Sequence, residues 1–199
     1  MNTISEYIDL DSRMRDKFNS FYNMVLNSPV NITAIKDPAD FAMKHVLDSL
    51  YFFMKNPQLK FNKLVDIGSG GGFPGLLLAM YYPDMQVTLI DSVGKKCKFM
   101  EECASKLALK NVRVINSRAE TVVGVKGDLI TARGVGTIKD VLKFSEYLVA
   151  NNGGWLMYKG EKLNDELEEA KHIIEERGLK SEIMRVETPF TRSYLYLHP

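Results

Sequence analysis

A cluster of five glycines follows a short apolar run and an acidic residue in the first half of the chain. The segment Leu64–Gly75 reads LVDIGSGGGFPG, and an apolar stretch typical of a helix comes next. Glycine adopts positive φ angles and lets a ligand approach the backbone closely, while the start of a helix offers unpaired N–H groups. We therefore expect a strand, a tight turn that includes Gly70, and a helix, which together line the site of a nucleoside-containing cofactor.

A second carboxylate stands where such a cofactor needs one. The apolar run Val87–Ile90 is typical of a buried strand, and Asp91 follows it directly. An acidic residue at the end of the second strand suits the two hydroxyl groups of a ribose. Asp91 could instead cap the helix that follows, but its place after this strand favours the ribose role.

The loop after the third expected strand contains Ala119 and Glu120. In a sheet of this kind that loop meets the adenine ring, where backbone N–H groups and a side-chain acceptor can bind N1 and the exocyclic amine. Glu120 is equally typical of a solvated helix start, so both interpretations stay open.

The glycine segment leaves two classes of cofactor to weigh. Gly70–Gly75 matches the GxGxxG pattern of dinucleotide-binding proteins, so a NAD(P)-binding regulatory module is one hypothesis. Asp66 lies inside the turn, where it would repel a pyrophosphate but could take the ammonium group of a methionine moiety. Helices precede the first strand, and a predicted hairpin stands where a separate catalytic domain would follow. These features favour S-adenosylmethionine.

The loop after the fourth expected strand, Thr131–Gly134, indicates the methyl acceptor. It lacks the Asn/Asp-Pro-Pro-aromatic sequence that holds an exocyclic amine, and it has no cysteine for covalent attack on cytosine. Arg133 remains, a cation that can bind guanine O6 or a phosphate. Guanine N7 carries a free lone pair and no proton, so its methylation needs positioning and no general base. Arg133 is the candidate catalytic residue, with a salt bridge to a nearby carboxylate as the alternative.

Strands and helices alternate from residue 63 onward. Before them, apolar spacing predicts a helix over 6–27, and Asp37-Pro38 is typical of the capped start of a helix that runs to about Lys55. The later expected elements are strands at 63–67, 86–90, 112–115, 128–132, 153–158, 181–186 and 193–197, and helices at 74–81, 94–108, 137–150 and 161–177.

This alternation predicts a single α/β domain over 1–199 with a mainly parallel sheet. Together with the features that favour S-adenosylmethionine, we expect the Rossmann-like fold of class I S-adenosylmethionine-dependent methyltransferases. The core, 63–199, is a mainly parallel seven-stranded sheet that ends in an antiparallel hairpin. Residues 1–58 form an N-terminal helical extension. Ligands of such sheets bind at the carboxyl ends of the strands.

Composition sets further limits. The 199 residues are 45% hydrophobic and 26% charged, which suits one domain with a sizeable core. Cys97 and Cys103 lack a CxxC spacing, which favours reduced packing residues over a metal or disulfide role. No apolar run approaches the roughly 18 residues of a membrane span, and the first residues lack the pattern of a signal peptide. We expect a cytoplasmic monomer without a membrane partner or a metal.

A net charge of +1 gives no global attraction to nucleic acid, so an RNA-binding surface must be local. Lys159 and Arg192 stand at or near expected strand ends, where each suits RNA contact and surface charge about equally. His45 is a third candidate for contact with the RNA substrate, although it heads an apolar helical face, where a hydrogen-bonded core histidine is the more common role. Guanine N7 is hidden in the deep major groove of A-form RNA, so a guanine substrate must be unpaired, bulged or flipped.

Several segments resemble the GidB (RsmG) family of 16S rRNA guanine-N7 methyltransferases, over roughly residues 16–197. They are Asn31–Ala34, His45–Ser49, Asp66–Gly75, Leu89–Lys96, Ser117–Glu120, Thr131–Gly134 and Tyr158–Gly160. The Gly-Phe-Pro-Gly and His-x-Leu-Asp-Ser elements are not general features of methyltransferases, which makes the match specific. The chain departs from the family in Thr131–Gly134, where a Ser-Arg-Ala sequence is common, and in Leu26–Pro29, which lacks the usual tryptophan.

The resemblance implies an activity, a cofactor and a set of contacts. The activity is methylation of a guanine in the 530 loop of 16S rRNA within the small ribosomal subunit, with S-adenosylmethionine as cofactor. The implied cofactor contacts are Gly68, Phe73, Ala119, Glu120 and Arg133. His45, Asp48 and Ser49 are implied to border the cleft. A small-molecule methyltransferase is the alternative enzyme hypothesis.

Overall fold

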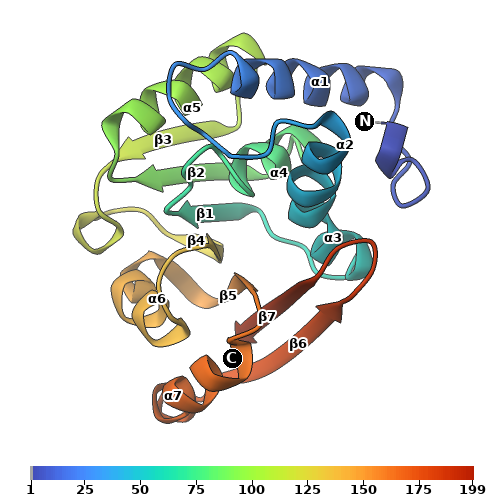
Figure 1. Ribbon diagram of the computed structural model, residues 1–199. Helices are drawn as coiled ribbons and strands as arrows, with labels where there is room; N and C mark the ends of the chain where they lie inside the picture. Colours follow the sequence, from blue (N-terminus) through green and yellow to red (C-terminus); the bar gives the residue numbers. More distant parts are fainter. Residues whose placement is uncertain (1) are drawn as a thin grey trace.

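A seven-stranded β-sheet forms the centre of the computed structural model, which describes residues 2–199 (Figure 1). Its strands lie in the order β3-β2-β1-β4-β5-β7-β6. They are β1 (Lys63–Ile67), β2 (Gln86–Asp91), β3 (Val112–Asn116), β4 (Gly127–Arg133), β5 (Val149–Lys159), β6 (Lys180–Val186) and β7 (Arg192–His198). Strands β1 to β5 pair in parallel, and β7 is antiparallel to both β5 and β6. The predicted fold class is confirmed.

Helices cover both faces of this sheet. They are α1 (Ser12–Leu26), α2 (Pro38–Phe41), α3 (Asp48–Lys55), α4 (Gly75–Tyr81), α5 (Gly94–Lys106), α6 (Ile138–Ser145) and α7 (Leu163–Glu176), with a π-helical segment η2 (Ala42–Leu47) and 3₁₀ turns η1 (Asn2–Ile4), η3 (Ala119–Thr121) and η4 (Glu146–Leu148). No helix within residues 2–199 is long and apolar enough to cross a membrane.

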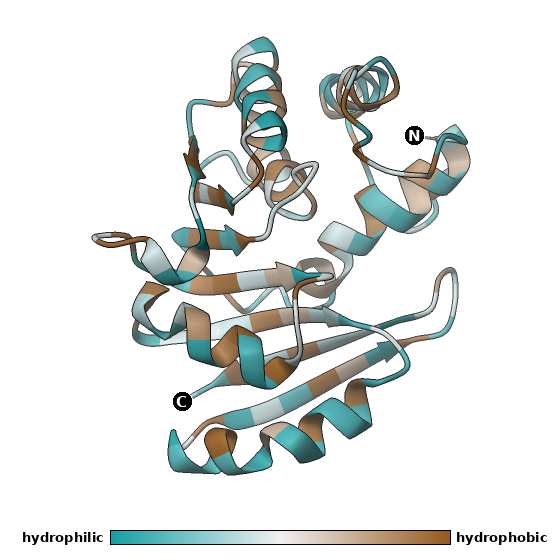
Figure 2. Ribbon diagram, turned by 60° about the vertical axis from the view of Figure 1, so that its left-hand side comes forward, coloured by the Kyte–Doolittle hydropathy of each residue, from teal (hydrophilic) through white to brown (hydrophobic). Residues whose placement is uncertain are grey.

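Apolar side chains on the two faces of the sheet form two separate hydrophobic clusters. Leu64 and Leu89 pack with α1, α3, α4 and α5, whereas the neighbouring Val65 and Ile90 pack with α6 and α7. This follows from the two-residue period of a strand, which sends successive side chains to opposite faces. Figure 2 shows strongly hydrophobic residues along the central strands and mixed colours on the helices. The N-terminal helices therefore belong to the packing of one sheet face.

Capping side chains set where the N-terminal helices begin. Asp37 accepts backbone N–H groups of the following turn at 2.9 Å, as predicted for a helix that starts with proline. The helix predicted over 6–27 begins only at Ser12, so its predicted start was wrong. Asp11 accepts a backbone N–H at 2.6 Å and caps the helix there. The apolar residues Tyr7 and Leu10 continue the helical spacing before this cap, although the backbone at these two residues is not helical.

Two other elements differ from the sequence expectation. The helix predicted over 137–150 ends early, because Val149 already pairs with Gly127 in the sheet. The helix from Pro38 to Lys55 is continuous, but Ala42–Leu47 is wound as a π-helix. Such segments are rare and cluster at functional sites. Apolar spacing does not distinguish this winding from an α-helix.

The buried side chain of Asp66 joins three core elements. Asp66 Oδ1 accepts the hydroxyl of Thr131 on β4 at 2.7 Å, and its Oδ2 accepts the N–H of Gly75, where α4 begins, at 3.2 Å. A Cβ at Gly75 would approach Asp66 Oδ2 to 2.8 Å, so only glycine allows this contact. Asp66 is 0% exposed and enclosed by protein. The structure therefore gives its carboxyl group a structural role, and the expected ammonium contact finds no open path to it.

Burial raises the pKa of Asp66 from 3.8 to about 6, although hydrogen bonds from Thr131, Ser69 and Gly75 oppose the shift. The folded protein therefore binds this proton more tightly than the unfolded chain, and the stability that the proton contributes is complete below about pH 4 and lost as the pH rises through about 6.

We predict that Asp66→Asn, which cannot ionise, gains stability relative to the wild type as the pH rises. Between about pH 4 and pH 7 the difference in unfolding free energy should shift by about 2 kcal/mol in favour of the variant. Urea unfolding across this range measures it. A difference that is independent of pH would contradict the prediction.

Candidate functional site

A crevice opens at the carboxyl ends of β1, β2 and β3, where sheets of this type bind ligands. It has a volume of about 290 Å³. The lining residues are Ile67, Gly68, Ile90, Asp91, Ser92, Ser117, Arg118, Ala119, Glu120, Val135 and Phe144. Four predicted cofactor residues, Gly68, Asp91, Ala119 and Glu120, thus share what we call the strand-end crevice.

Backbone geometry explains the glycines of the first turn. Gly68 has φ +62°, and a Cβ there would collide with the side chain of Val135. Gly70 has φ +58°, and its N–H donates to Asp91 Oδ2 at 2.8 Å. Non-glycine residues rarely adopt these angles. Gly68 lets the chain pass close to the crevice, while Gly70 is fixed behind it by Asp91.

Asp91 holds two loops with one carboxylate. Its Oδ2 accepts the N–H of Gly70, and its Oδ1 accepts the N–H of Val93 at 2.8 Å. The side chain is 7% exposed and lines the crevice. Each carboxylate oxygen can accept a second hydrogen bond. The two roles that the sequence left open, helix start and hydroxyl acceptor, are therefore compatible.

Ala119 and Glu120 occupy the η3 turn at the rim of the crevice. Ala119 is half-buried, and Glu120 is exposed, with its carboxylate 3.9 Å from the guanidinium of Arg118. An exposed ion pair of this kind is weak, so the carboxylate of Glu120 remains able to accept a hydrogen bond from a ligand in the crevice.

Arg133, at the end of β4, belongs to a buried cluster of charges. The carboxylate of Asp48 is 0% exposed and lies 3.1 Å from Arg133 Nη1. Arg192 binds the same carboxylate with two hydrogen bonds of 2.8 and 2.9 Å, and the hydroxyl of Tyr194 donates to Asp48 Oδ1 at 3.0 Å. The salt bridge weighed as the alternative for Arg133 is therefore present. Two guanidinium groups on one carboxylate leave a net positive charge.

His45 contacts both Arg133 and Phe73. Arg133 Nη2 is 2.7 Å from His45 Nδ1, and because a guanidinium only donates, Nδ1 is the acceptor. His45 Nε2 must then carry the proton, which it donates to Thr33 Oγ1 at 2.9 Å. The imidazole stacks on Phe73, with ring centroids 4.1 Å apart. Burial, with the cations of Arg133 and Arg192, lowers the pKa of His45 to about 3. His45 is thus a neutral ring that orients Arg133.

A second cavity, of about 390 Å³, adjoins the strand-end crevice and shares Val135 with it. Its walls are Ala132, Arg133, Gly134, Val135, Gly136, Tyr158, Lys159, Gly160, Glu166 and Arg192. We call it the Arg133 pocket. It brings together Arg133, Lys159 and Arg192, all singled out from sequence. His45 and Phe73 lie behind Arg133 and line neither this pocket nor the strand-end crevice.

Lys159 is buried in the wall of the Arg133 pocket, with 7% of its surface exposed. Its Nζ donates to Gly136 O at 3.0 Å and to Glu166 Oε2 at 2.6 Å. Sequence reasoning did not single out Glu166, which lies within an acidic helix that is typical of a solvated surface. No local signal marks it, because its role depends on how α7 packs against β5.

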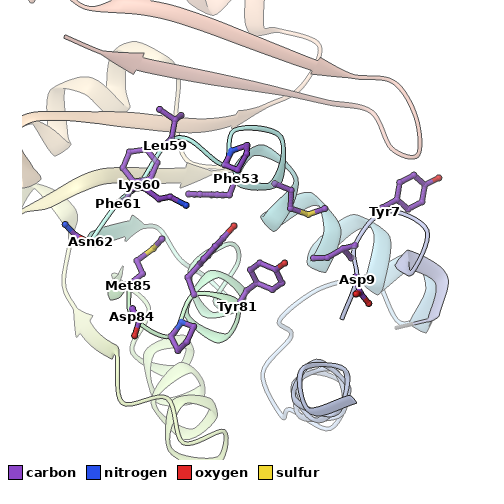
Figure 3. Close-up of a pocket in the computed structure, with 15 residues that line it drawn as sticks. Tyr7, Asp9, Phe53, Leu59, Lys60, Phe61, Asn62, Tyr81, Asp84 and Met85 are labelled. Atoms are coloured by element: carbon purple, nitrogen blue, oxygen red, sulfur yellow. The ribbon is translucent and has the colours of Figure 1, made fainter. Parts of the chain in front are cut away.

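The largest of the described cavities, of about 610 Å³, lies near the opposite, amino ends of β1 and β2 (Figure 3). Aromatic side chains such as Phe53, Phe61 and Tyr81 dominate its wall. None of the sequence-predicted site residues lines it. Size alone therefore does not identify the functional site in this fold.

We predict that Asp48→Asn lowers the unfolding free energy by about 3–5 kcal/mol, because Arg133 and Arg192 then lose their buried counter-charge. Asp40→Asn is the matched control on the same continuous helix. Asp40 pairs with Lys44, and both side chains are 52% exposed, so its loss should cost at most about 1 kcal/mol. Urea unfolding of both variants measures the difference. Equal losses would contradict the assignment of Asp48 as the anchor of the cluster.

Comparison with known proteins places this site in a family. The family model of GidB, described as rRNA small subunit methyltransferase G, matches residues 14–192. A ribosomal RNA small subunit methyltransferase G of Alteromonas mediterranea is 37% identical over 157 residues, covering 78% of this chain and 69% of its own. The protein of the same name from Lactobacillus johnsonii is 37% identical over 186 residues, covering 87% of this chain and 77% of its own.

Solved structures confirm the fold. A SAM-dependent methyltransferase from Aquifex aeolicus superposes with a TM-score of 0.61 at 20% identity, covering 81% of this chain and 93% of its own. A ribosomal protein L11 methylase from Lactobacillus delbrueckii subsp. bulgaricus gives a TM-score of 0.60 at 15% identity, covering 77% of this chain and 77% of its own. The predicted cofactor, S-adenosylmethionine, is confirmed over a nicotinamide dinucleotide. The crevice residues fit it, since Gly68 gives close backbone approach and Asp91 supplies a carboxylate. The chain belongs to the GidB family, the small-subunit rRNA methyltransferases G, and is a methyltransferase.

Proposed function

We propose that the protein methylates guanine N7 in the 530 loop of 16S ribosomal RNA. The observation that carries this proposal is the position of the Arg133 pocket, a cavity lined by three cations that meets the strand-end crevice at Val135. Guanine offers O6 next to N7, so cations can hold the base while N7 faces the crevice. The names of the relatives support ribosomal RNA as the substrate.

S-adenosylmethionine supplies an electrophilic methyl group when bound. The N7 lone pair would form the bond to this methyl carbon, and the electron pair of the cleaved bond would stay with the sulfur of the cofactor. No proton leaves in this step, so the site needs no general base. Arg133 contributes by holding O6 or a phosphate, and His45 and Asp48 fix the direction of its guanidinium. Rate acceleration then comes largely from positioning.

Several finer predictions belong to this proposal. Gly68, Gly70, Phe73, Ala119 and Glu120 shape the cofactor site, with Asp91 as the ribose acceptor and Arg133 facing both ligands. Phe73 acts by stacking on His45 and by lying under the guanidinium of Arg133, whose carbon is 5.7 Å from the ring centroid. Arg192 is the better candidate for phosphate contact, because 23% of its side chain is exposed, against 8% for Lys159. A monomer that acts in the cytoplasm on the small ribosomal subunit fits this role.

The proposal predicts one labelled nucleoside. The protein is incubated with methyl-labelled S-adenosylmethionine and 30S subunits from cells that lack the modification, and the RNA is digested. N7-methylguanosine from the 530 loop is expected. Free nucleosides serve as the comparison substrate for the small-molecule alternative. Label in another nucleoside, or turnover on free nucleosides alone, would contradict the proposal.

Arg133→Ala should reduce kcat/KM for transfer about 100-fold or more, because the acceptor base loses its orienting cation. The variant should stay folded, since Arg192 still balances Asp48. Arg13→Ala on the exposed part of α1 is the matched control and should leave the rate unchanged. Methylation assays with thermal melts of each variant test this. A wild-type rate in Arg133→Ala would refute the assigned role.

A further inference from the structure

Glu166 lines the Arg133 pocket, and its carboxylate oxygen Oε1 has no hydrogen-bond partner among residues 2–199. Its Oε2 accepts from Lys159 Nζ at 2.6 Å and from the backbone N–H of Ile138 at 3.0 Å. Every hydrogen bond of this carboxylate within the described chain is on Oε2, and the side chain is 19% exposed. Two donors fix the carboxylate from one side, so Oε1 has a defined position and free lone pairs.

Once N7 and O6 of guanine are placed, the remaining edge of the base presents hydrogen-bond donors, which complement a carboxylate acceptor. Guanine presents N7 and O6 as acceptors on one side, and N1–H and the 2-amino group as donors beyond O6. With N7 toward Val135, the acceptors suit the cations of the pocket, and the donors need an acceptor in the wall. Glu166 is the carboxylate among the lining residues. Adenine offers an acceptor at N1 and would meet this carboxylate with repulsion.

We propose that Glu166 selects guanine by accepting hydrogen bonds from N1–H and the 2-amino group through Oε1. This inference rests on the proposed function and names the residue that recognises the base. A site built to bind a donor strongly rejects an analogue that lacks it, because a buried acceptor is then left unpaired.

Charge development adds a second contribution from the same group. As the bond to N7 forms, positive charge spreads over the purine and makes N1–H a stronger donor. Arg133, Lys159 and Arg192 oppose that charge, whereas the Glu166 carboxylate is attracted to it. The hydrogen bond therefore strengthens from ground state to transition state, which is the condition for an interaction to raise kcat.

Inosine at the target position tests the proposal, since it lacks only the 2-amino group. Reconstituted 30S particles with guanosine or inosine there are methylated by the wild type and by Glu166→Gln. The wild type should prefer guanosine about 10- to 100-fold in kcat/KM, the range for a hydrogen bond to a charged group. Glu166→Gln should bring this preference to within about threefold. Each enzyme gives a ratio of kcat/KM for guanosine to kcat/KM for inosine. Any difference in the intrinsic reactivity of N7 between the two bases affects both ratios equally, so it cancels when the wild type and Glu166→Gln are compared.

Glu169→Gln, an exposed change one helical turn further along α7, is the control and should keep the wild-type preference. If Glu166→Gln lowers both rates by one factor, Glu166 only supports Lys159 and α6, and the inference is overturned. If Glu166→Gln fails to fold, Glu166→Asp keeps the charge and should retain a preference for guanosine; its loss there would also overturn it. Absence of N7-methylguanosine with the wild type would instead refute the proposed function.

Discussion

The geometry of the Arg133 pocket depends on the ion pairs that the buried carboxylate of Asp48 makes with Arg133 and Arg192. Asp48 joins the continuous helix from Pro38 to Lys55 to the end of β4 through Arg133 and to the start of β7 through Arg192. Removing three charges from water is costly, so the cluster stands only because both guanidinium groups share one carboxylate and Tyr194 adds a hydrogen bond. The helical extension thus supplies the counter-charge for Arg133 and Arg192, two of the cations that line the Arg133 pocket.

This arrangement separates two electrostatic environments. The strand-end crevice carries the carboxylates of Asp91 and Glu120, which suit hydroxyl and amine groups of an adenosine. The Arg133 pocket carries three cations and one carboxylate, which suit a base joined to phosphates. A protein with a net charge of +1 can therefore concentrate positive potential where RNA would enter. Val135, between two glycines with positive φ, stands at the meeting point.

Features that short motifs and the order of elements determine could be predicted from the sequence. Contacts between residues far apart in the chain could not. The glycine turn, the carboxylate of Asp91 and the parallel sheet follow from short motifs and from alternation of elements. Asp48 and Arg192 lie 144 residues apart, so no spacing rule pairs them. Burial lowers the pKa of His45 most, and the cations that arrive from β4 and β7 lower it further, so its neutral state also depends on distant packing. The π-helical winding of Ala42–Leu47 also stayed hidden, because it leaves the apolar pattern of a helix intact.

A crystal structure with S-adenosylhomocysteine and 7-methylguanosine monophosphate would show directly which cavity holds the cofactor and which holds the base. The adenosine should lie in the strand-end crevice against Asp91, and the sulfur should face the N7-methyl group past Val135. The purine should lie in the Arg133 pocket, with O6 toward Arg133 and its donor edge toward Glu166. A purine bound in the aromatic cavity near Tyr81, or a sulfur directed away from the Arg133 pocket, would contradict this arrangement.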